Sequence, residues 1–252
     1  MKKQTLCLII IIIIVAGIVH LSFYENQAQN HILIPIKLDD KYGYKNQNGK
    51  IVIRPKYKQA LNFCNEKALV QYCNNKNECH VDLINKRGKK INKQKIISNL
   101  DFFNNLSVAS INGQYGYINK CGDFVIKPIY EVASTFNDNL APVAIYDVSR
   151  RCNLWGYINL KGETVIPFQF FEANQFIDDI AIVKTLIGYN IIDKEGRMLC
   201  KQNFFSDMPP TTTNKKIFTY KIHSNWPFDT YTEVIELDCN CRIINRYDYS
   251  TN

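Results

Sequence analysis

Hydrophobic pairs recur along this chain just before a short polar stretch and a glycine. In most copies a pair of aliphatic or aromatic residues runs into Asn or Asp, and in every copy a glycine follows that Asn or Asp by three residues. The turn glycines are Gly49, Gly88, Gly122, Gly162 and Gly196. Asn or Asp opening a type I turn, with glycine in the left-handed conformation after it, is typical of a three-residue hairpin connection. The pattern therefore predicts five tight hairpins, each between two strands.

A third strand completes each predicted unit. Aromatic residues stand eight and fourteen positions after most turn glycines, and the better copies place an alanine between them, as Tyr57, Ala60 and Phe63 show. That spacing suits one short helical turn. The third strands are the apolar runs that begin at Ala68, Ser107, Ala141 and Ala181. We therefore expect an all-β repeat array of short meander units, stacked as a curved solenoid, with a closed propeller-like ring as the alternative.

A second set of small or polar residues lies six positions before each turn glycine. Its members are Gly43, Asp82, Gly116, Gly156 and Asn190. Gly, Asn and Asp are the residues that most readily adopt a left-handed backbone. We therefore interpret this preference as conformational.

Read as aromatic-Gly-Tyr-Ile-Asn-x-x-Gly-x-x-Val-Ile, then x-x-Tyr-x-x-Ala-x-x-Phe and x-Leu-Ala-x-Val, the unit resembles the WG-repeat family. The copies nearest to it run from Tyr42 to Val70, Tyr115 to Val143 and Trp155 to Val183. The resemblance covers roughly residues 40–205, and the Trp-Gly pair itself stands once, as Trp155-Gly156. It implies short β-strand repeats and a role in interactions, and it transfers no catalytic residues.

The N-terminus carries an apolar segment that predicts a hydrophobic helix. Lys2 and Lys3 precede the run, which is the pattern of a helix whose first residues stay in the cytoplasm. We predict a cytoplasmic region at 1–5 and an uncleaved signal-anchor at 6–24, with a cleaved signal peptide as the alternative. The protein would then be membrane-anchored with its repeats in the periplasm or at the cell surface, or secreted if the segment is cleaved.

The rest of the chain divides into three parts. We predict a linker with a first strand at 25–39, five repeats at 40–207 and a degenerate capping unit at 208–252. In the last part the stretch from Val234 to Cys241 echoes the strand-turn pattern, with Cys241 in the place of the glycine. Repeat arrays need such a unit to close an exposed end.

The spacing of the repeats alternates and points to candidate binding loops. Successive turn glycines are 39, 34, 40 and 34 residues apart, and the extra residues fall between the third strand and the next unit. Insertions in a stacked array commonly project at a binding face. Neutral insertions on exposed turns are the alternative. The candidate binding residues are Asn74, Asn75, Lys76, Asn77, Glu78, Val148, Ser149, Arg150 and Arg151.

The charge distribution and the cysteines bear on the kind of partner and on disulfide formation. The net charge of +8 is spread along the chain, and we interpret the one dense cluster, from Lys86 to Lys95, as a solvated hairpin tip and not a nucleic-acid site. Cys73 and Cys79 face each other across a predicted hairpin, so we predict a disulfide between them. The pairing of the remaining cysteines stays open, because eight allow too many combinations.

Motifs that carry chemistry are sparse. His80 near Cys73 and Cys79 has no zinc spacing, and the pair Asp178-Asp179 falls where the repeat has a polar turn. We interpret the recurring aromatic rings as a stacked core, not a carbohydrate-binding strip. We predict no catalytic residue, metal or cofactor, and a non-enzymatic binding or scaffold module for a protein or envelope polymer. The alternatives are an envelope enzyme or enzyme inhibitor with its site in the C-terminal part, and a purely structural component.

Overall fold

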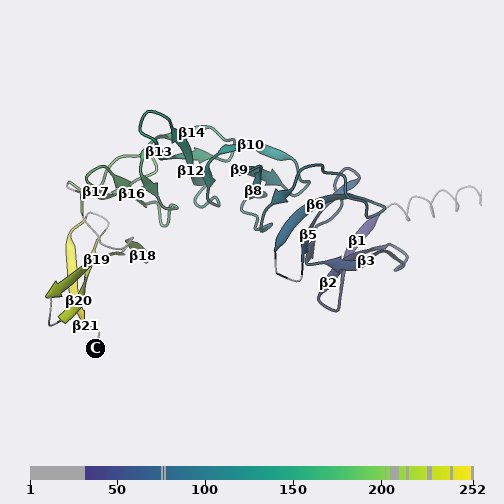
Figure 1. Ribbon diagram of the computed structural model, residues 1–252, viewed down its shortest axis with the longest axis horizontal. Coiled ribbons are helices and arrows are strands. Elements are labelled where there is room, and N and C mark those ends of the chain that lie inside the picture. Colours follow the sequence, from purple (N-terminus) through teal and green to yellow (C-terminus); the bar gives the residue numbers. More distant parts are fainter. Residues whose placement is uncertain are drawn as a thin grey trace, which may run out of the picture. The chain divides into compact units, whose positions relative to one another are not determined.

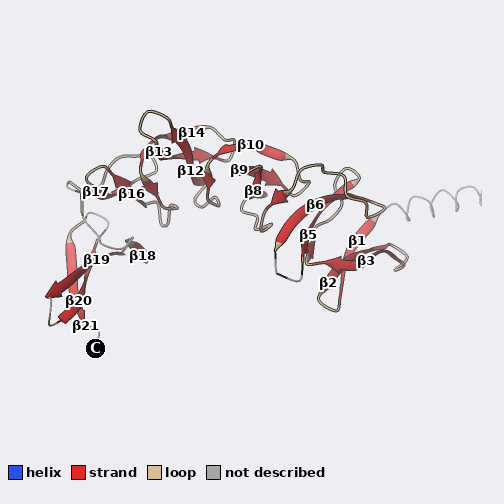
Figure 2. Ribbon diagram, viewed as in Figure 1, coloured by secondary structure: helices blue, strands red, loops and turns tan. Residues whose placement is uncertain are grey.

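The structure, a computed structural model, describes residues 32–74, 76, 78–201, 203–204, 210–213, 216–225, 229–238 and 241–250. Every regular element in these residues is a β-strand, which confirms the all-β prediction (Figures 1 and 2). The predicted signal-anchor at 6–24 and the loop residues Asn75 and Asn77 lie outside the described residues. Within them, no helix has the length and apolar character to cross a membrane. The choice between solenoid and ring stays a prediction.

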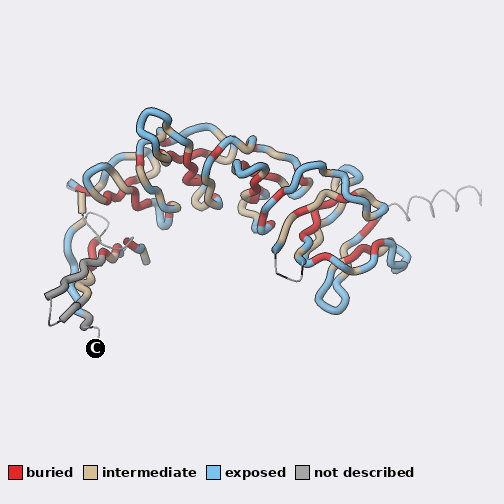
Figure 3. Tube along the Cα trace, in the orientation of Figure 1, coloured by how far each residue is buried: buried red, intermediate tan, exposed pale blue. Residues whose placement is uncertain are grey.

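The described chain divides into two compact units. Residues up to Ile97 together with Lys120–Gly122 form unit 1, and Ser98–Asn119 with the residues from Asp123 onward form unit 2. In both units the buried residues lie along the strands, whereas hairpin tips are exposed (Figure 3). The hydrophobic periodicity of the sequence thus reports which side of each strand meets a core.

Unit 1 holds the first two repeats. Its first sheet has the order β1-β2-β3, and β4 to β7 follow as consecutive antiparallel neighbours. The strands are β1 (Leu33–Leu38), β2 (Lys41–Asn46), β3 (Ile51–Tyr57), β4 (Gln59–Ala60), β5 (Lys67–Cys73), β6 (Cys79–Asn85) and β7 (Ile96–Ile97). Their shared core contains Leu33, Tyr44, Ile53, Ala68 and Ile84.

Unit 2 holds the remaining repeats and the C-terminal unit. Its strands pair antiparallel with their sequence neighbours in four groups, β8–β10, β11–β14, β15–β17 and β18–β21. The strands are β8 (Leu106–Ile111), β9 (Gln114–Asn119), β10 (Phe124–Tyr130), β11 (Val132–Ala133), β12 (Leu140–Asp147), β13 (Cys152–Asn159), β14 (Thr164–Phe170), β15 (Glu172–Ala173), β16 (Ala181–Thr185), β17 (Gly188–Ile192), β18 (Thr211–Thr213), β19 (Lys216–Asn225), β20 (Asp229–Leu237) and β21 (Ile243–Ser250).

A buried tyrosine organises each of the three best repeats. Its hydroxyl donates a 2.7 Å hydrogen bond to a main-chain carbonyl seventeen residues later, and its ring packs against a phenylalanine with centroids 4.7–4.9 Å apart. Offset or edge-on contact of this kind stabilises ring pairs beyond simple burial. The three copies are Tyr44 with Leu61 and Phe63, Tyr117 with Ser134 and Phe136, and Tyr157 with Asn174 and Phe176.

The short helical turn predicted between the second and third strands is wrong. The alanines of this segment lie in the two-residue strands β4, β11 and β15, each paired with the third strand. In the first copy Ala60 pairs with Val70, and the Leu61 N–H donates to the Leu69 carbonyl at 2.9 Å. These N–H groups find carbonyls on the third strand, so no helical hydrogen bonds form.

All five turn glycines lie in the left-handed region, with φ between 73° and 83°. The N–H of Gly49 donates to the Asn46 carbonyl at 3.0 Å, and the Asn46 side chain accepts from the Lys50 N–H at 2.9 Å. The same bonds occur in the C-terminal unit, where Cys241 has φ of 62° and its N–H donates to the Asp238 carbonyl at 2.9 Å. The degenerate unit therefore keeps the hairpin of the repeat.

The conformational interpretation of the second glycine set is wrong. Gly43, Gly116 and Gly156 lie outside the left-handed region. A Cβ atom would stand 2.4 Å from the Ile53 carbonyl oxygen at Gly43, and 2.4 and 2.6 Å from equivalent oxygens at Gly116 and Gly156. Glycine is required because the neighbouring strand approaches too closely for any side chain.

Asn190 shows what replaces this glycine where the second strand is incomplete. Within the described residues of the fifth repeat, that strand is reduced to isolated bridges that pair Ile192 with Met198 and Tyr189 with Phe204. The buried Asn190 amide donates to the Asn203 side chain at 2.5 Å and accepts from the Cys200 N–H at 3.2 Å. A polar side chain thus makes contacts that the missing ladder does not supply.

Candidate functional site

A hollow of 520 Å³ opens in unit 2 beside the equivalent hairpin tips of two successive repeats. We call it the Arg150 hollow. One tip is the loop of residues 148–151 between β12 and β13, and the other is the turn Leu186-Ile187 between β16 and β17. It is lined by Arg150, Cys152, Gln169, Phe170, Phe171, Thr185, Leu186 and Met198. Its volume falls within the range of pockets that bind ligands or partner side chains.

Local hydrogen bonds fix the shape of the first tip. The Asp147 carboxylate accepts from the Ser149 hydroxyl at 2.6 Å and from the Arg150 N–H at 2.9 Å. The Ser149 hydrogen bond and the Arg150 N–H lower the pKa of Asp147 below its ordinary value. Arg151 adopts a left-handed backbone with φ of 53°. The loop is therefore a formed structure, and its most exposed apolar residue is Val148, at 80%.

The second tip holds two apolar side chains out in solvent. Leu186 is 84% exposed and Ile187 is 66% exposed. The Thr185 hydroxyl donates to the Gly188 carbonyl at 2.8 Å and accepts from the Asn203 amide at 2.9 Å. Because the turn is tied down at its base, these side chains are presented at little further cost in conformational entropy.

The hollow combines apolar walls with one positive group. Phe171, Leu186 and Met198 supply the apolar surface. Within the described residues no carboxylate forms an ion pair with the Arg150 guanidinium, so its donors are available to a ligand. Cys152 lines the same hollow and carries a free thiol. The site suits a ligand with an apolar part and a nearby anionic oxygen.

Of the predicted binding residues in the second loop, Arg150 lines the hollow, while Val148, Ser149 and Arg151 flank it in the same loop. The first predicted loop belongs to unit 1. There the Asn74 side chain accepts from the N–H groups of Lys76 and Glu78 at 2.9 and 3.0 Å, and Cys73 and Cys79 are joined by a disulfide. The described residues of this loop are therefore bonded to one another.

Sequence reasoning missed Leu186, Met198 and Phe171. The equivalent tip of the third repeat is Asn112-Gly113, a polar turn with φ of 52° and 84°. Leu186-Ile187 in that place breaks the rule that hairpin tips are polar, and this was the available signal. Nothing in the repeat pattern marks Met198 or Phe171.

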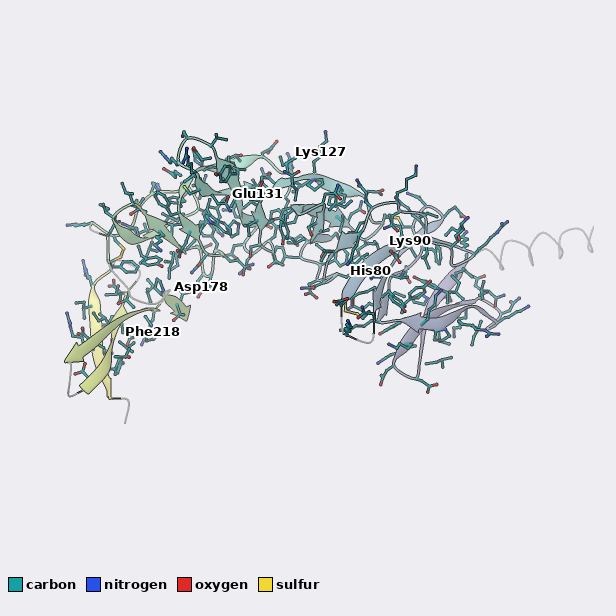
Figure 4. The ribbon with its side chains drawn as sticks, viewed as in Figure 1. His80, Lys90, Lys127, Glu131, Asp178 and Phe218 are labelled. Atoms are coloured by element: carbon teal, nitrogen blue, oxygen red, sulfur yellow. A yellow bond between two sulfur atoms is a disulfide. The ribbon has the colours of Figure 1, made fainter. Side chains whose placement is uncertain are left out.

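Other clusters of charged residues are structural. Asp82 lies 2.5 Å from the Lys90 ammonium and 3.4 Å from His80, both labelled in Figure 4. Asp178 and Asp179 have φ of 53° and 70°, the geometry of a two-residue hairpin turn. In the part of the chain that the structure describes, no group of three or more His, Cys, Asp or Glu side chains is placed to hold a metal ion.

Each unit contains one further disulfide. Cys64 pairs with Cys121 within unit 1, and Cys200 pairs with Cys241 within unit 2. The second joins the fifth repeat to the left-handed turn residue of the C-terminal unit. The sequence left both pairings open.

Comparisons with known proteins agree with the repeat register. Residues 42–76, 115–147 and 155–185 match the family model described as WG containing repeat. These segments begin at Tyr42, Tyr115 and Trp155, the three copies that carry the sequence resemblance. No curated protein matches the chain.

Solved structures with a related arrangement are distant in sequence. One, described as the eukaryotic initiation factor, has 8% identity and a TM-score of 0.49 over 86% of this chain and 62% of its own. The WD40 domain of Toxoplasma gondii coronin has 10% identity and a TM-score of 0.35 over 88% of this chain and 65% of its own. A DUF4221 family member from Bacteroides vulgatus has 12% identity and a TM-score of 0.33, covering 88% of both chains. These likenesses carry no argument about function.

Proposed function

We propose that this chain, whose residues 42–76, 115–147 and 155–185 match the WG containing repeat model, is a non-enzymatic binding module that engages a partner protein at the Arg150 hollow. The observation that carries the proposal is that equivalent hairpin tips of two successive repeats line this hollow together, with Leu186 exposed on a turn held by the Thr185 hydroxyl. Repeats stacked in a solenoid would extend this surface along neighbouring tips.

The chemistry of the hollow defines the segment that would bind. Apolar residues at the centre of an interface supply most of its binding energy when a partner side chain buries them. Leu186, Met198 and Phe171 would surround an aliphatic or aromatic side chain of the partner. Arg150 would pair with an Asp or Glu of the same segment, since a guanidinium binds a carboxylate through two parallel hydrogen bonds.

We further propose that the module works outside the cytoplasm. Two observations support this compartment: the apolar segment at 6–24 behind Lys2 and Lys3, and three disulfides among the described cysteines. Disulfides persist mainly in oxidising environments. An anchored module of this kind would hold its partner at the membrane surface.

No observation favours the alternative of an enzyme site in the C-terminal part over binding. The most strongly bonded carboxylate there is Glu236, which pairs with Lys216 at 2.7 Å and accepts from Asn245 and Tyr247 at 2.9 and 2.8 Å. The hydrogen bond from Lys216, and then those from Asn245 and Tyr247, lower the pKa of Glu236 to about 2. Its oxygens are engaged within the β18–β21 sheet.

Affinity capture with matched surface variants tests the proposal. Residues 30–252 are immobilised and exposed to native envelope extract, beside the variants Leu186→Ser and Arg150→Glu. The control is Ile129→Ser, because Ile129 is 58% exposed but does not line the hollow. We expect one partner that the native domain and the control retain and both hollow variants lose. Equal retention by all four proteins would contradict the proposal.

A further inference from the structure

A second hollow of unit 2, with a volume of 410 Å³, forms around Trp155. We call it the Trp155 hollow. Besides the indole ring, its polar walls come from Ser134, Asn174, Gln175, Thr211 and Thr212, and its apolar walls from Ala173, Ile177, Ile182 and Pro210. None of the residues that line it is charged. Its walls therefore combine apolar and polar groups without a charge, which distinguishes it from the Arg150 hollow.

Trp155 packs partly against the core and is partly accessible to solvent. Trp155 packs against the core cluster that contains Tyr157, Phe170 and Phe176, yet the residue is only half-buried. Its strand position is fixed by pairing with Ala144 on β12 and Phe170 on β14. The ring is therefore a rigid aromatic surface at the wall of a hollow.

The polar groups around the ring are held by the repeat itself. Ser134 and Asn174 occupy equivalent positions in successive repeats, where their carbonyls accept from Tyr117 and Tyr157. Within the described residues, no hydrogen bond occupies the Ser134 hydroxyl or the Asn174 side-chain amide. Gln175 is fixed next to them, because its amide donates to the Thr135 carbonyl at 2.8 Å. Donors and acceptors thus stand at fixed places beside the indole.

We propose that the Trp155 hollow binds a neutral carbohydrate, with one sugar ring stacked on the indole. A pyranose presents an apolar face of C–H groups that packs on an aromatic ring, and its hydroxyls both donate and accept hydrogen bonds. Side-chain amides and hydroxyls offer the same double capacity. An apolar ligand would leave these groups unpaired on desolvation, which is unfavourable. A phosphate or uronic acid would find no cation in the wall.

This inference does not rest on the protein-binding proposal, since the two hollows have separate linings. It also refines the interpretation of the aromatic repeat positions. The tyrosines and phenylalanines of the core, such as Tyr117 and Phe176, are fully or nearly fully buried. Trp155, at a different repeat position, reaches a hollow.

The test uses Trp155 as its own reporter. The chain has two tryptophans, so Trp226→Phe leaves Trp155 as the sole indole. Its fluorescence, and calorimetry in parallel, are followed against cellotetraose, maltotetraose, mannotetraose and chitotetraose. Tetragalacturonate and decaproline are the charged and peptide probes. We expect saturable binding of at least one neutral tetrasaccharide and neither of the other probes.

Matched amide variants locate the binding. Asn174→Ala should weaken the neutral sugar about 10-fold, the loss expected for one hydrogen-bonding partner. Gln169→Ala removes an amide from the lining of the Arg150 hollow and should leave the affinity unchanged. Trp155→Ala should abolish binding in calorimetry. If Trp155→Ala unfolds, Asn174→Ala remains as the test, because the Asn174 side chain is exposed. The proposal would be overturned if no neutral tetrasaccharide bound at a concentration on the order of 10 mM. It would also be overturned if the protein preferred tetragalacturonate or decaproline, or if Gln169→Ala lost as much affinity as Asn174→Ala.

Discussion

The Tyr157 hydroxyl donates a 2.7 Å hydrogen bond to the main-chain carbonyl of Asn174, seventeen residues along the chain. Tyr157 is fully buried, whereas the side chain of Asn174 lines the Trp155 hollow. One bond therefore joins the core of the repeat to a candidate binding surface. The same relation recurs between Tyr44 and Leu61, and between Tyr117 and Ser134.

Removing one of these hydroxyls should weaken the fold measurably. Tyr117→Phe keeps the ring against Phe136 but leaves the Ser134 carbonyl without its donor. We expect the free energy of unfolding to fall by about 1–2 kcal/mol, the usual loss for such a bond. Urea unfolding measures it, with the exposed Tyr146→Phe as the control. Equal stability of the two variants would show that the hydroxyl contributes nothing.

Alkaline pH should destabilise the repeats. Burial raises the pKa of Tyr44, Tyr117 and Tyr157 well above the ordinary value of 10.0. A folded-state pKa above the unfolded one means that the stabilisation is complete below the unfolded pKa and is lost as pH rises beyond it. The free energy of unfolding should therefore decline above about pH 10. Urea unfolding of protein alkylated at Cys152 checks this, and a smaller decline is expected for Tyr117→Phe. A flat profile to about pH 11.5 contradicts the account.

Two glycines six residues apart should respond differently to the same change. Gly43→Ala places a Cβ atom 2.4 Å from the Ile53 carbonyl oxygen and 2.6 Å from the Pro55 nitrogen, so the backbone must move. We expect a loss of about 3 kcal/mol or more. Gly49→Ala meets no atom within 4 Å and suffers only its positive φ, which costs about 1–2 kcal/mol. A larger loss at Gly49 than at Gly43 would refute the close-approach explanation.

These two glycines also show which features of the fold can be predicted from the sequence and which cannot. Gly49 belongs to a local turn, whose four residues are contiguous, so the pattern predicts its left-handed backbone. Gly43 responds to a strand that begins eight residues later, and no local rule reports that approach. The spacing of Ala60 from Phe63 predicts a helical turn, but the pairing of Ala60 with Val70 makes the segment extended.

Less of the candidate site than of the fold could be predicted from the sequence. The sequence predicts Arg150 as a binding residue because its loop is longer than the repeat requires. The hollow also needs Phe171, Leu186 and Met198, which come from other elements and meet Arg150 only through tertiary folding. Likewise, Cys64 and Cys121 are separated by 57 residues, and only the folding of unit 1 brings them together. Local patterns predict repeats well, whereas contacts between repeats depend on packing.

Removing different disulfides should lower the free energy of unfolding by different amounts. Replacing Cys64 and Cys121 with Ser opens a cross-link between residues 57 apart, whereas Cys73 and Cys79 are 6 apart. Because a longer loop restricts the unfolded chain more, we expect losses of about 4 and about 2 kcal/mol respectively. Urea unfolding under oxidising conditions measures both, after non-reducing peptide mapping has established the three links. Free thiols at Cys64 and Cys121 in exported protein would contradict the assignment.

Photo-crosslinking from Cys152 tests the central claim most directly, since this thiol lines the Arg150 hollow. The thiol is labelled with benzophenone-maleimide in a Cys239→Ser background and irradiated in native envelope extract. The control carries the label at Ile129→Cys, with Cys152→Ser added. The account predicts a covalent adduct with one partner from Cys152, abolished by Leu186→Ser and absent from the control. An adduct from position 129 with none from Cys152 would contradict binding at this hollow.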